Sequence, residues 1–335
     1  QWGGGWLASD GFSDFAGSTL VHGCGGAAAL AGVIVLGARE GRFGRKGEKK
    51  SMQPFAASSI PLVTLGTFLL WFGWFGFNGF SQLAMGTFDD VNAISKIAVN
   101  THLAGAAGTF TGAAITRLIG GKTDIVMMLN GALAGLVAIT AEPLTPGPIT
   151  AMFIGSIGAV IMYFGTKMLE SYGLDDVVGA IPVHMFAGIF GTLVVPLTNP
   201  DTSFGTQFIG TASVCIFSFV LSWATFTALK STIGLRISKE AEKLGINIYW
   251  NSTVTNTFGY RKINSIEIMN LPESKYHNFS LGLYAVLAIG RIKEGSQEYQ
   301  GVPIDTIRDI SKRSDDFLQG GIEKLIRSCY TVETL

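Results

Sequence analysis

The stretch that decides the fold is DFAGSTLVHGCGG, residues 14–26. It begins with a carboxylate, Asp14, and carries a histidine, His22, among small and apolar residues. No charged residue follows Asp14 until Arg39. A charge-free run of this length predicts a membrane-spanning helix, because a hydrocarbon core of roughly 30 Å takes about 17–25 helical residues.

Charged residues divide the rest of the chain in the same way up to residue 235. Only 14% of all residues are charged, against about 25% in ordinary soluble domains. Because the apolar runs lack the alternation of barrel strands, we predict seven transmembrane helices in an all-α polytopic bundle. The second run is the longest, and we expect its helix at about 60–83, after Pro54 and Pro61. The charge-free runs are 15–38, 51–88, 97–116, 125–141, 143–166, 177–200 and 202–229.

Lysine and arginine are unevenly shared between the two sides of these helices. One side includes the loop 37–50, with six basic residues, whereas the other side has only Lys96. Basic loops stay in the cytoplasm. We therefore expect residues 1–13 to form an extracytoplasmic loop, 14–235 the transmembrane region and 236–335 a cytoplasmic tail of unknown fold. The net charge of zero gives no signal for nucleic acid.

A second stretch, DVVGAIPVHMFAG at 176–188, repeats the first pattern. In both, an aspartate lies eight residues before a valine-preceded histidine, His22 or His184, and a glycine lies four residues after it. The two helices cross in opposite directions, which is typical of an inverted repeat with its site near the midplane. At 1.5 Å per residue each histidine would lie ~12 Å from its aspartate, so the two could meet. The simpler alternative is two separate histidines bonded to backbone carbonyls, and His102, which has no such match, is given that interpretation.

Several motifs resemble the ammonium transporter family (Amt/MEP/Rh). DFAGSTLVHGCGGAAALAGVIVLGAREGRFG resembles its fifth helix, LLWFGWFGFNGFS its sixth, LNGALAGLVAIT its eighth and DDVVGAIPVHMFAG its tenth. GLRISKEAEKLGI is similar to the start of the family's cytoplasmic tail. The resemblance covers about residues 1–248 and implies an eleven-helix inverted-repeat fold that assembles as a homotrimer. It also implies an N-terminally truncated fragment holding the fifth to eleventh helices, which should form no pore alone.

The resemblance assigns roles residue by residue. His22 and His184 match the family's twin pore histidines, and Phe77 matches one of two phenylalanines that gate the pore. Trp2 and Ser81 match the aromatic and hydroxyl groups of the outer recruitment site. Asp14 matches a supporting acidic residue. Gly179 departs from the pattern, since many members have an aspartate there.

The function implied is ammonium transport rather than enzymatic catalysis, with no cofactor and no metal. Ammonium would be recruited outside, deprotonated and conducted as ammonia plus a proton past the histidines. The expected partners are ammonium or ammonia, the lipid bilayer, two further copies of the chain and a cytoplasmic regulatory protein at the tail. The expected location is the plasma or inner membrane.

Two alternatives stay open from the residues. The same fold could act as an ammonium sensor that signals through the tail. Paired membrane histidines could also be the axial ligands of a haem. Residues 249–335 resemble no family, although FSLGLYAVLAIG is apolar and Ile304, Ile307 and Ile310 follow a helical rhythm.

Overall fold

The computed structural model describes residues 1–43, 55, 57–237, 298–299 and 302–303. The chain divides into two units, Gln1–Arg236 and Ile237–Leu335. In the second unit the described residues form two short antiparallel strands, β1 (Glu298–Tyr299) and β2 (Val302–Pro303), with Tyr299 opposite Val302. The apolar run at 279–290 and the isoleucine rhythm from Ile304 lie outside the described residues.

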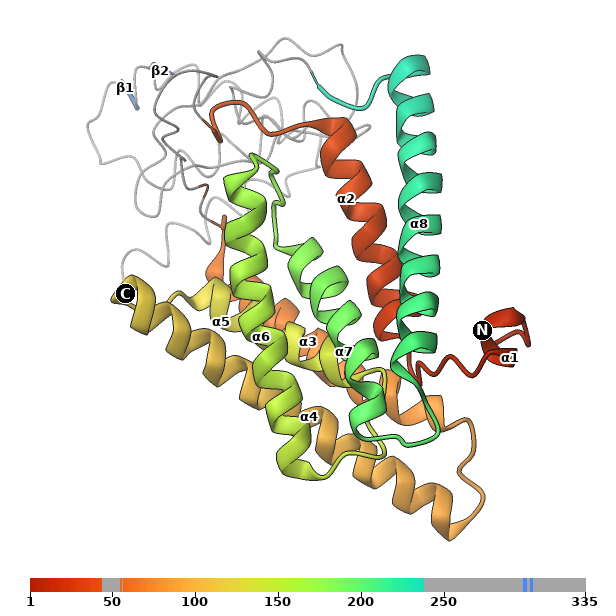
Figure 1. Cartoon of the computed structure of the whole chain (residues 1–335). Helices are drawn as coiled ribbons and strands as arrows, with labels where there is room; N and C mark the ends of the chain where they lie inside the picture. The colour runs from red at the N-terminus through yellow and green to blue at the C-terminus, as the bar shows by residue number, and fades with distance from the viewer. Residues whose placement is uncertain (44–54, 56, 238–297, 300–301, 304–335) are drawn as a thin grey trace, which may run out of the picture. The chain divides into compact units, whose positions relative to one another are not determined.

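Each of the seven predicted spans coincides with helical structure in the first unit (Figure 1). A single-turn helix, α1 (Trp6–Ser9), precedes them. The spans are, in order, η1 (Ser18–Gly23) with α2 (Cys24–Leu36); α3 (Ile60–Gly79) with η2 (Phe80–Gln82); α4 (Phe88–Gly120); α5 (Ile125–Ile139); α6 (Pro148–Ser171); η3 (Ile181–Phe186) with α7 (Ala187–Val194) and η4 (Val195–Leu197); and α8 (Phe204–Thr232).

Polar side chains set the starts of four of these helices. An unpaired N–H at a helix start needs an acceptor, and Ser, Thr and Asp provide it best. Thr87 and Asp90 form a reciprocal capping box at α4. The other side-chain caps are Ser59 on α3, Asp124 on α5 and Ser203 on α8.

Helix length and composition agree with a membrane protein. Ser18–Leu36, Ile60–Gln82, Pro148–Ser171 and Phe204–Thr232 are each long and apolar enough to cross a bilayer. Ile125–Ile139 and Ile181–Leu197 are shorter apolar helices. At 33 residues, α4 is longer than the predicted span 97–116, but Asn100, Thr101 and His102 make its middle less apolar.

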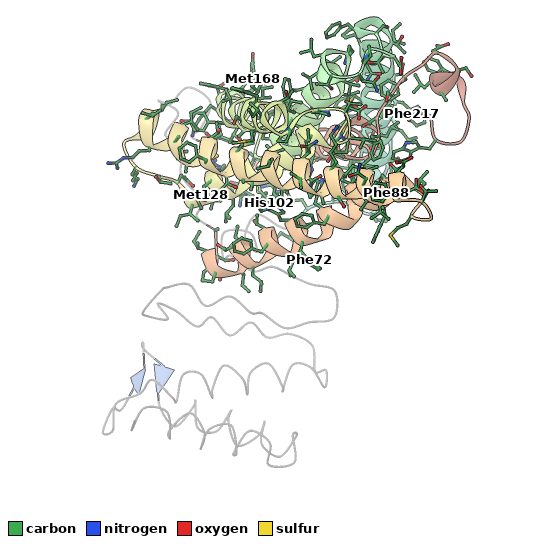
Figure 2. All side chains as sticks on the ribbon, turned by 90° about the horizontal axis from the view of Figure 1, so that it is seen from below. Phe72, Phe88, His102, Met128, Met168 and Phe217 are labelled. Carbon is green, nitrogen blue, oxygen red and sulfur yellow. The ribbon has the colours of Figure 1, made fainter. Side chains whose placement is uncertain are left out.

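Large apolar side chains point away from the bundle (Figure 2). Phe72 on α3, Phe88 on α4 and Phe217 on α8 are 78%, 83% and 70% exposed. Many other large apolar side chains on these helices are also exposed, which is unusual for a soluble monomer. Lipid is the environment in which such a surface is stable, because acyl chains are as apolar as the side chains themselves.

Glycines bring α4, α5 and α6 into backbone contact. A Cβ added at Gly108 or Gly131 would collide with the carbonyl oxygen of the other residue. A Cβ at Gly155 of α6 would meet the carbonyl of Ala104. Small residues at such crossings allow the close approach on which helix packing in membranes depends. The contact fixes the scaffold on which α3 and the two histidine helices rest.

Candidate functional site at a stacked histidine pair

The structure brings His22 and His184 together. Their ring centroids lie 5.3 Å apart and their planes are inclined by 21°. His22 is on η1 and His184 is on η3, so the two matching sequence stretches supply one ring each. A relation predicted from direction and spacing is therefore present as a contact between residues 162 positions apart.

Both histidines lie in π-helical turns, which the sequence did not predict. Ser18–Gly23 and Ile181–Phe186 are each a π-helix of 6 residues. Residues 15–17, which lie between Asp14 and the first π turn, are not helical. The expected spacing of 1.5 Å per residue from Asp14 is therefore wrong, because that rise belongs to a regular α-helix. Single π turns inside α-helices occur frequently at functional sites.

The two aspartates cap these turns in the same way. The Asp14 carboxylate accepts hydrogen bonds from the N–H groups of Ser18, Thr19 and Leu20, at 2.7–2.8 Å. The Asp176 carboxylate accepts from Gly179, Ala180 and Ile181, at 2.7–3.0 Å. Free N–H groups at a helix start are a site for negative charge. The supporting role given to Asp14 thus has a local physical basis, and Asp176 is its structural counterpart.

The glycines that follow each histidine are packed against the other histidine's helix. A Cβ added at Gly26 would lie 2.5 Å from the backbone nitrogen of Met185, the residue after His184. A Cβ at Gly188 would collide with the carbonyl oxygen of Ser18 and lie 3.3 Å from the nitrogen of Gly23, next to His22. This reciprocal packing sets the distance between the rings.

Two aromatic residues of α3 complete the site. The Trp74 ring stacks on His22, at 4.9 Å between centroids and 19° between planes, and Phe77 lies 5.3 Å from His22. Trp74 is buried and its indole N–H donates to Thr140 Oγ1 at 2.8 Å. From the sequence only Phe77 was assigned to the pore, and Trp74 was given no role there. The spacing of three residues, which places both rings on one helix face, could have identified it.

Each histidine keeps one buried ring nitrogen without a partner among the described residues. These atoms are Nε2 of His22 and Nδ1 of His184. A buried polar atom without a partner is unfavourable and is rare in native proteins. The pair therefore offers two hydrogen-bonding atoms to a small polar molecule, beside the rings of Trp74 and Phe77.

The remaining predicted residues lie at other positions. Trp2 is 61% exposed, and one of its ring carbons would lie 3.3 Å from a Cβ added at Gly17. The Ser81 hydroxyl donates to the Phe77 carbonyl at 2.7 Å. Within the described residues no hydrogen bond or ring contact joins Trp2 to Ser81. His102 contacts the rings of Trp71 and Phe75 instead of the pair.

The geometry does not fit a haem between the two histidines. Axial ligands direct one ring nitrogen each at the iron from opposite faces of the macrocycle. Here the imidazoles stack face to face at 5.3 Å, which leaves no room for a macrocycle between them. For a bound metal ion, no group of three or more His, Cys, Asp or Glu side chains occurs in the described part of the chain.

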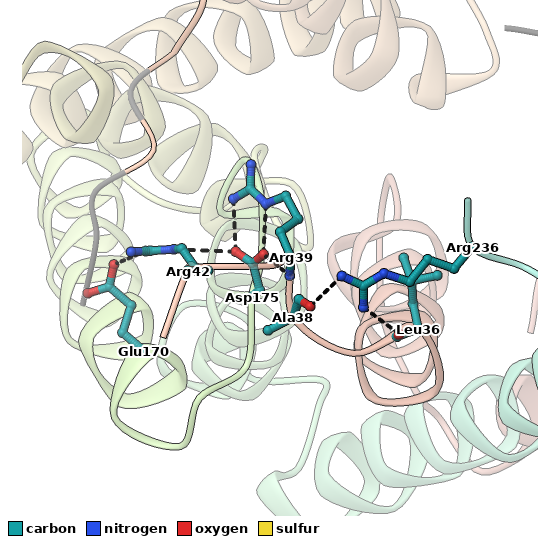
Figure 3. Close-up of polar contacts among 7 residues, drawn as sticks. All are labelled: Leu36, Ala38, Arg39, Arg42, Glu170, Asp175 and Arg236. Carbon is teal, nitrogen blue, oxygen red and sulfur yellow. Dashed lines mark hydrogen bonds and ion pairs between the residues drawn. The ribbon is translucent and has the colours of Figure 1, made fainter. Parts of the chain in front are cut away.

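A polar cluster lies beyond the ends of the two histidine helices (Figure 3). Asp175 receives three hydrogen bonds from Arg39, through the backbone N–H, Nε and Nη2, at 2.7–3.0 Å. Burial alone would raise the pKa of the Asp175 carboxyl. The hydrogen bonds and charge of Arg39, with the charge of Arg42, outweigh burial and lower this pKa below 3.8.

This shift predicts an acid-side loss of stability. A carboxylate with a depressed folded-state pKa stabilises the fold above its unfolded-state pKa, and the contribution is lost as pH falls through the folded-state value. We expect Asp175→Asn to lower the melting temperature at pH 7, and the difference from the unchanged protein to shrink below about pH 4. Thermal unfolding in detergent between pH 3 and 7 measures it. Asp201→Asn, at an exposed carboxylate, is the control, and a difference that does not vary with pH would contradict the assignment.

A family model described as the Ammonium Transporter Family matches residues 1–254. The chain belongs to this family. Similar proteins include a putative ammonium transporter of Synechocystis sp., 38% identical over 83% of this chain and 51% of that protein. Ammonium transporter Amt2 of Archaeoglobus fulgidus is 40% identical over 76% of this chain and 59% of that protein.

Solved structures of the family have the same fold. One titled Sensor Amt Protein has a TM-score of 0.66 at 34% identity, over 71% of this chain and 60% of that one. The crystal structure of Candida albicans Mep2 has a TM-score of 0.62 at 29% identity, over 71% and 56%. The prediction of a polytopic helical membrane protein is confirmed. The chain spans between half and two thirds of the length of these relatives.

Proposed function

We propose that the complete protein containing this sequence transports ammonium across the cell membrane. The observation that carries the proposal is the stacked pair His22–His184, with one unpartnered buried nitrogen on each ring, in a chain of the Ammonium Transporter Family. The relatives named ammonium transporters support the substrate. The chain would act as a homotrimer, with residue 1 on the outer side and the tail in the cytoplasm.

The site suits ammonia better than a bare cation. Ammonium and potassium ions have similar size and charge, but only ammonium can donate hydrogen bonds and lose a proton. An ion without its water costs several kcal/mol or more in an apolar path. Trp74 and Phe77, whose rings contact His22, would line that path. We therefore propose deprotonation before the pair, followed by passage of ammonia along the free ring nitrogens.

The histidine pair can also carry the proton that ammonium loses. A neutral imidazole has one donor and one acceptor nitrogen, and its unperturbed pKa lies near neutrality. Two rings at 5.3 Å between centroids are close enough for transfer directly or through one small molecule. Net transport would then be electrogenic, and potassium, with no proton to lose, would be excluded.

An outer site made of Trp2 and Ser81 would recruit the cation. An aromatic face attracts a cation by about 0.5–2 kcal/mol. The Ser81 hydroxyl donates its hydrogen bond to the Phe77 carbonyl. The lone pairs of its oxygen can therefore accept a hydrogen bond from an N–H group of ammonium. Potassium cannot make that bond.

Ammonium sensing is a second candidate. The likeness to a structure titled Sensor Amt Protein, at a TM-score of 0.66, favours it. The polar residues after 236 would then transmit the signal. A sensor would bind ammonium at the same residues without sustained flux, so flux separates the two functions.

Flux through the purified complete protein in liposomes is the deciding test. We expect a transient inward current on a step of ammonium and none on an equal step of potassium. An ammonium step without current, in protein shown to be folded, would contradict the proposal. Ammonium binding without current would favour the sensor.

Substitutions in the outer site are expected to change apparent affinity. Ser81→Ala removes the acceptor and Trp2→Leu removes the aromatic face, so each should raise the half-saturating ammonium concentration by about tenfold. The maximal current should change little, because both residues act before deprotonation. Current against ammonium concentration measures both quantities.

Matched controls exist for both variants. Ser95 donates its hydroxyl to the carbonyl four residues earlier, as Ser81 does, but on α4. Trp6 is as exposed as Trp2, at 57%, but lies on α1. Neither Ser95→Ala nor Trp6→Leu should shift the curve. A loss of maximal current at unchanged affinity in the Ser81 or Trp2 variants would show that the outer site is misplaced.

A further inference from the structure

The segment that follows the His22 helix is attached to the segment that precedes the His184 helix. α2 ends at Leu36, and Gly37 turns the chain with φ of 81°. Arg39 follows and holds Asp175 by the three hydrogen bonds described above. Asp175 directly precedes Asp176, whose carboxylate caps η3. The contact between Arg39 and Asp175 thus connects the C-terminal end of the His22 helix to the N-terminal end of the His184 helix.

A second layer of charges surrounds this contact. Arg42 lies between two carboxylates, with Nη2 at 2.9 Å from Glu170 and Nε at 3.4 Å from Asp175. Lys167 adds a partner for Glu170 at 3.1 Å. The side chain of Asp175 is only 2% exposed, whereas that of Lys167 is 48% exposed. The Asp175 carboxylate is therefore poorly screened by water, although the Arg39 side chain is 34% exposed, and the Lys167 ammonium is well screened.

A cation on α8, Lys230, and a cation just after it, Arg236, hold the same end of α2 from the other side. Lys230 donates to the carbonyl of Val35, and Arg236 donates to the carbonyls of Leu36 and Ala38 (Figure 3). The carbonyls of Val35 and Leu36 are unsatisfied acceptors at the C-terminus of α2, where positive charge is favourable. The end of the His22 helix is therefore fixed to α8, and Arg39 transmits that fixed position to Asp175.

We propose that the Arg39–Asp175 ion pair is a positioning device that sets the position of the His184 ring relative to the His22 ring. The inference rests on the proposed function for its consequence, since the pair's register would determine ammonium selectivity. Arg39 touches neither ring. It acts through the backbone from Asp175 to the Asp176 cap, which anchors the π turn of His184. Misplacement of a reacting group by about 1 Å can lower a rate by about a hundredfold, so a small shift would be measurable.

A structural readout tests the positioning without any transport assay. His22→Cys and His184→Cys are combined with Cys24→Ser, Cys215→Ser and Cys329→Ser, and mercuric ion is added to bridge the two thiols. At one mercuric ion per protein, protection of both thiols from maleimide labelling reports the bridge, because separate ions could then cover only one thiol. We expect Asp175→Ala or Arg39→Ala to slow bridging by about tenfold. Lys167→Ala, which removes a cation from the screened edge of the same cluster, should leave it unchanged.

The consequence for selectivity is measured in the complete protein with both histidines present. We expect Asp175→Ala to lower the ratio of ammonium to potassium current by about tenfold, and Lys167→Ala to leave it unchanged. Arg39→Lys keeps the charge but loses the two-pronged contact, so it should give an intermediate ratio. If an alanine variant does not fold, Arg39→Lys and Asp175→Asn are measured in its place.

The outcomes separate the two proposals. Unchanged bridging in folded Arg39 and Asp175 variants overturns the positioning device, whatever the current. Slower bridging with an unchanged current ratio overturns its role in selectivity. If the unchanged protein carries no ammonium current while bridging slows in the variants, the proposed function fails and the positioning device stands.

Discussion

His22→Asp in the complete protein is expected to leave a conducting pore that no longer excludes potassium. A pair of neutral imidazoles offers hydrogen bonds to ammonia but no fixed charge. A buried carboxylate in place of the His22 ring would stabilise a bare cation by several kcal/mol, because the local dielectric constant is low. Potassium could then enter without losing a proton. Currents in potassium and in ammonium, measured on the same liposomes, give the ratio.

Two further variants define the control and the contrary result. His22→Ala should abolish the ammonium-driven current, because it removes one half of the proposed relay. His102→Asp places the same carboxylate on α4 beside Trp71 and Phe75, away from the pair, and should not admit potassium. If His22→Asp carries ammonium normally and still excludes potassium, the histidine is not a selectivity element. His22 would then have a structural role only.

Gly26→Ala is expected to cause the largest loss of folded protein among the substitutions considered. The new methyl group would lie 2.5 Å from the Met185 nitrogen and 2.9 Å from the Met185 Cα, and neither backbone atom can move without moving His184. Overpacking in a tight interior costs typically about 1–3 kcal/mol and more where backbone must shift. The yield of monodisperse protein and its melting temperature in detergent measure the effect.

The adjacent residue provides the control for this prediction. Gly25 lies on the same helix, and a Cβ there would meet nothing within 4 Å. Gly25→Ala replaces a poor helix former by the best one and should be neutral or slightly stabilising. If Gly26→Ala and Gly25→Ala behave alike, the contact between α2 and the His184 turn is looser than described. In that case reciprocal glycine packing does not set the ring distance.

The sequence was sufficient to predict the spans and the meeting of the histidines. Charge-free length depends on local composition alone, so each of the seven runs coincided with helical structure. The approach of His22 and His184 followed from matched spacing in helices of opposite direction. The assignment of Trp2 and Ser81 to one outer site stays a prediction, since it came from resemblance and no hydrogen bond or ring contact joins the two in the described part of the chain.

Other features depend on contacts that sequence does not encode locally. The π turns at Ser18–Gly23 and Ile181–Phe186 arise from a shift of one hydrogen-bond position, and no residue type specifies that shift. The Arg39–Asp175 pair joins residues 136 positions apart in two loops. The three-residue spacing puts Trp74 on the same face of α3 as Phe77, but the contact of that face with His22 is seen only in the assembled bundle. Such long-range pairings become visible only in the assembled bundle.

The π turns also make the geometry of the histidine site sensitive to the number of residues in each turn. A π turn holds one more residue than the α-helical turn it replaces, so deleting one residue from Ser18–Gly23 would restore regular helix. Because each residue of an α-helix advances by about 100°, such a deletion would turn either the histidine or Gly26 away from its partner. A substitution in this stretch keeps the number of residues in the turn. The deletion of one codon changes that number and so disrupts the approach of the two histidines in a single step. The same constraint acts separately on the second turn, at Ile181–Phe186.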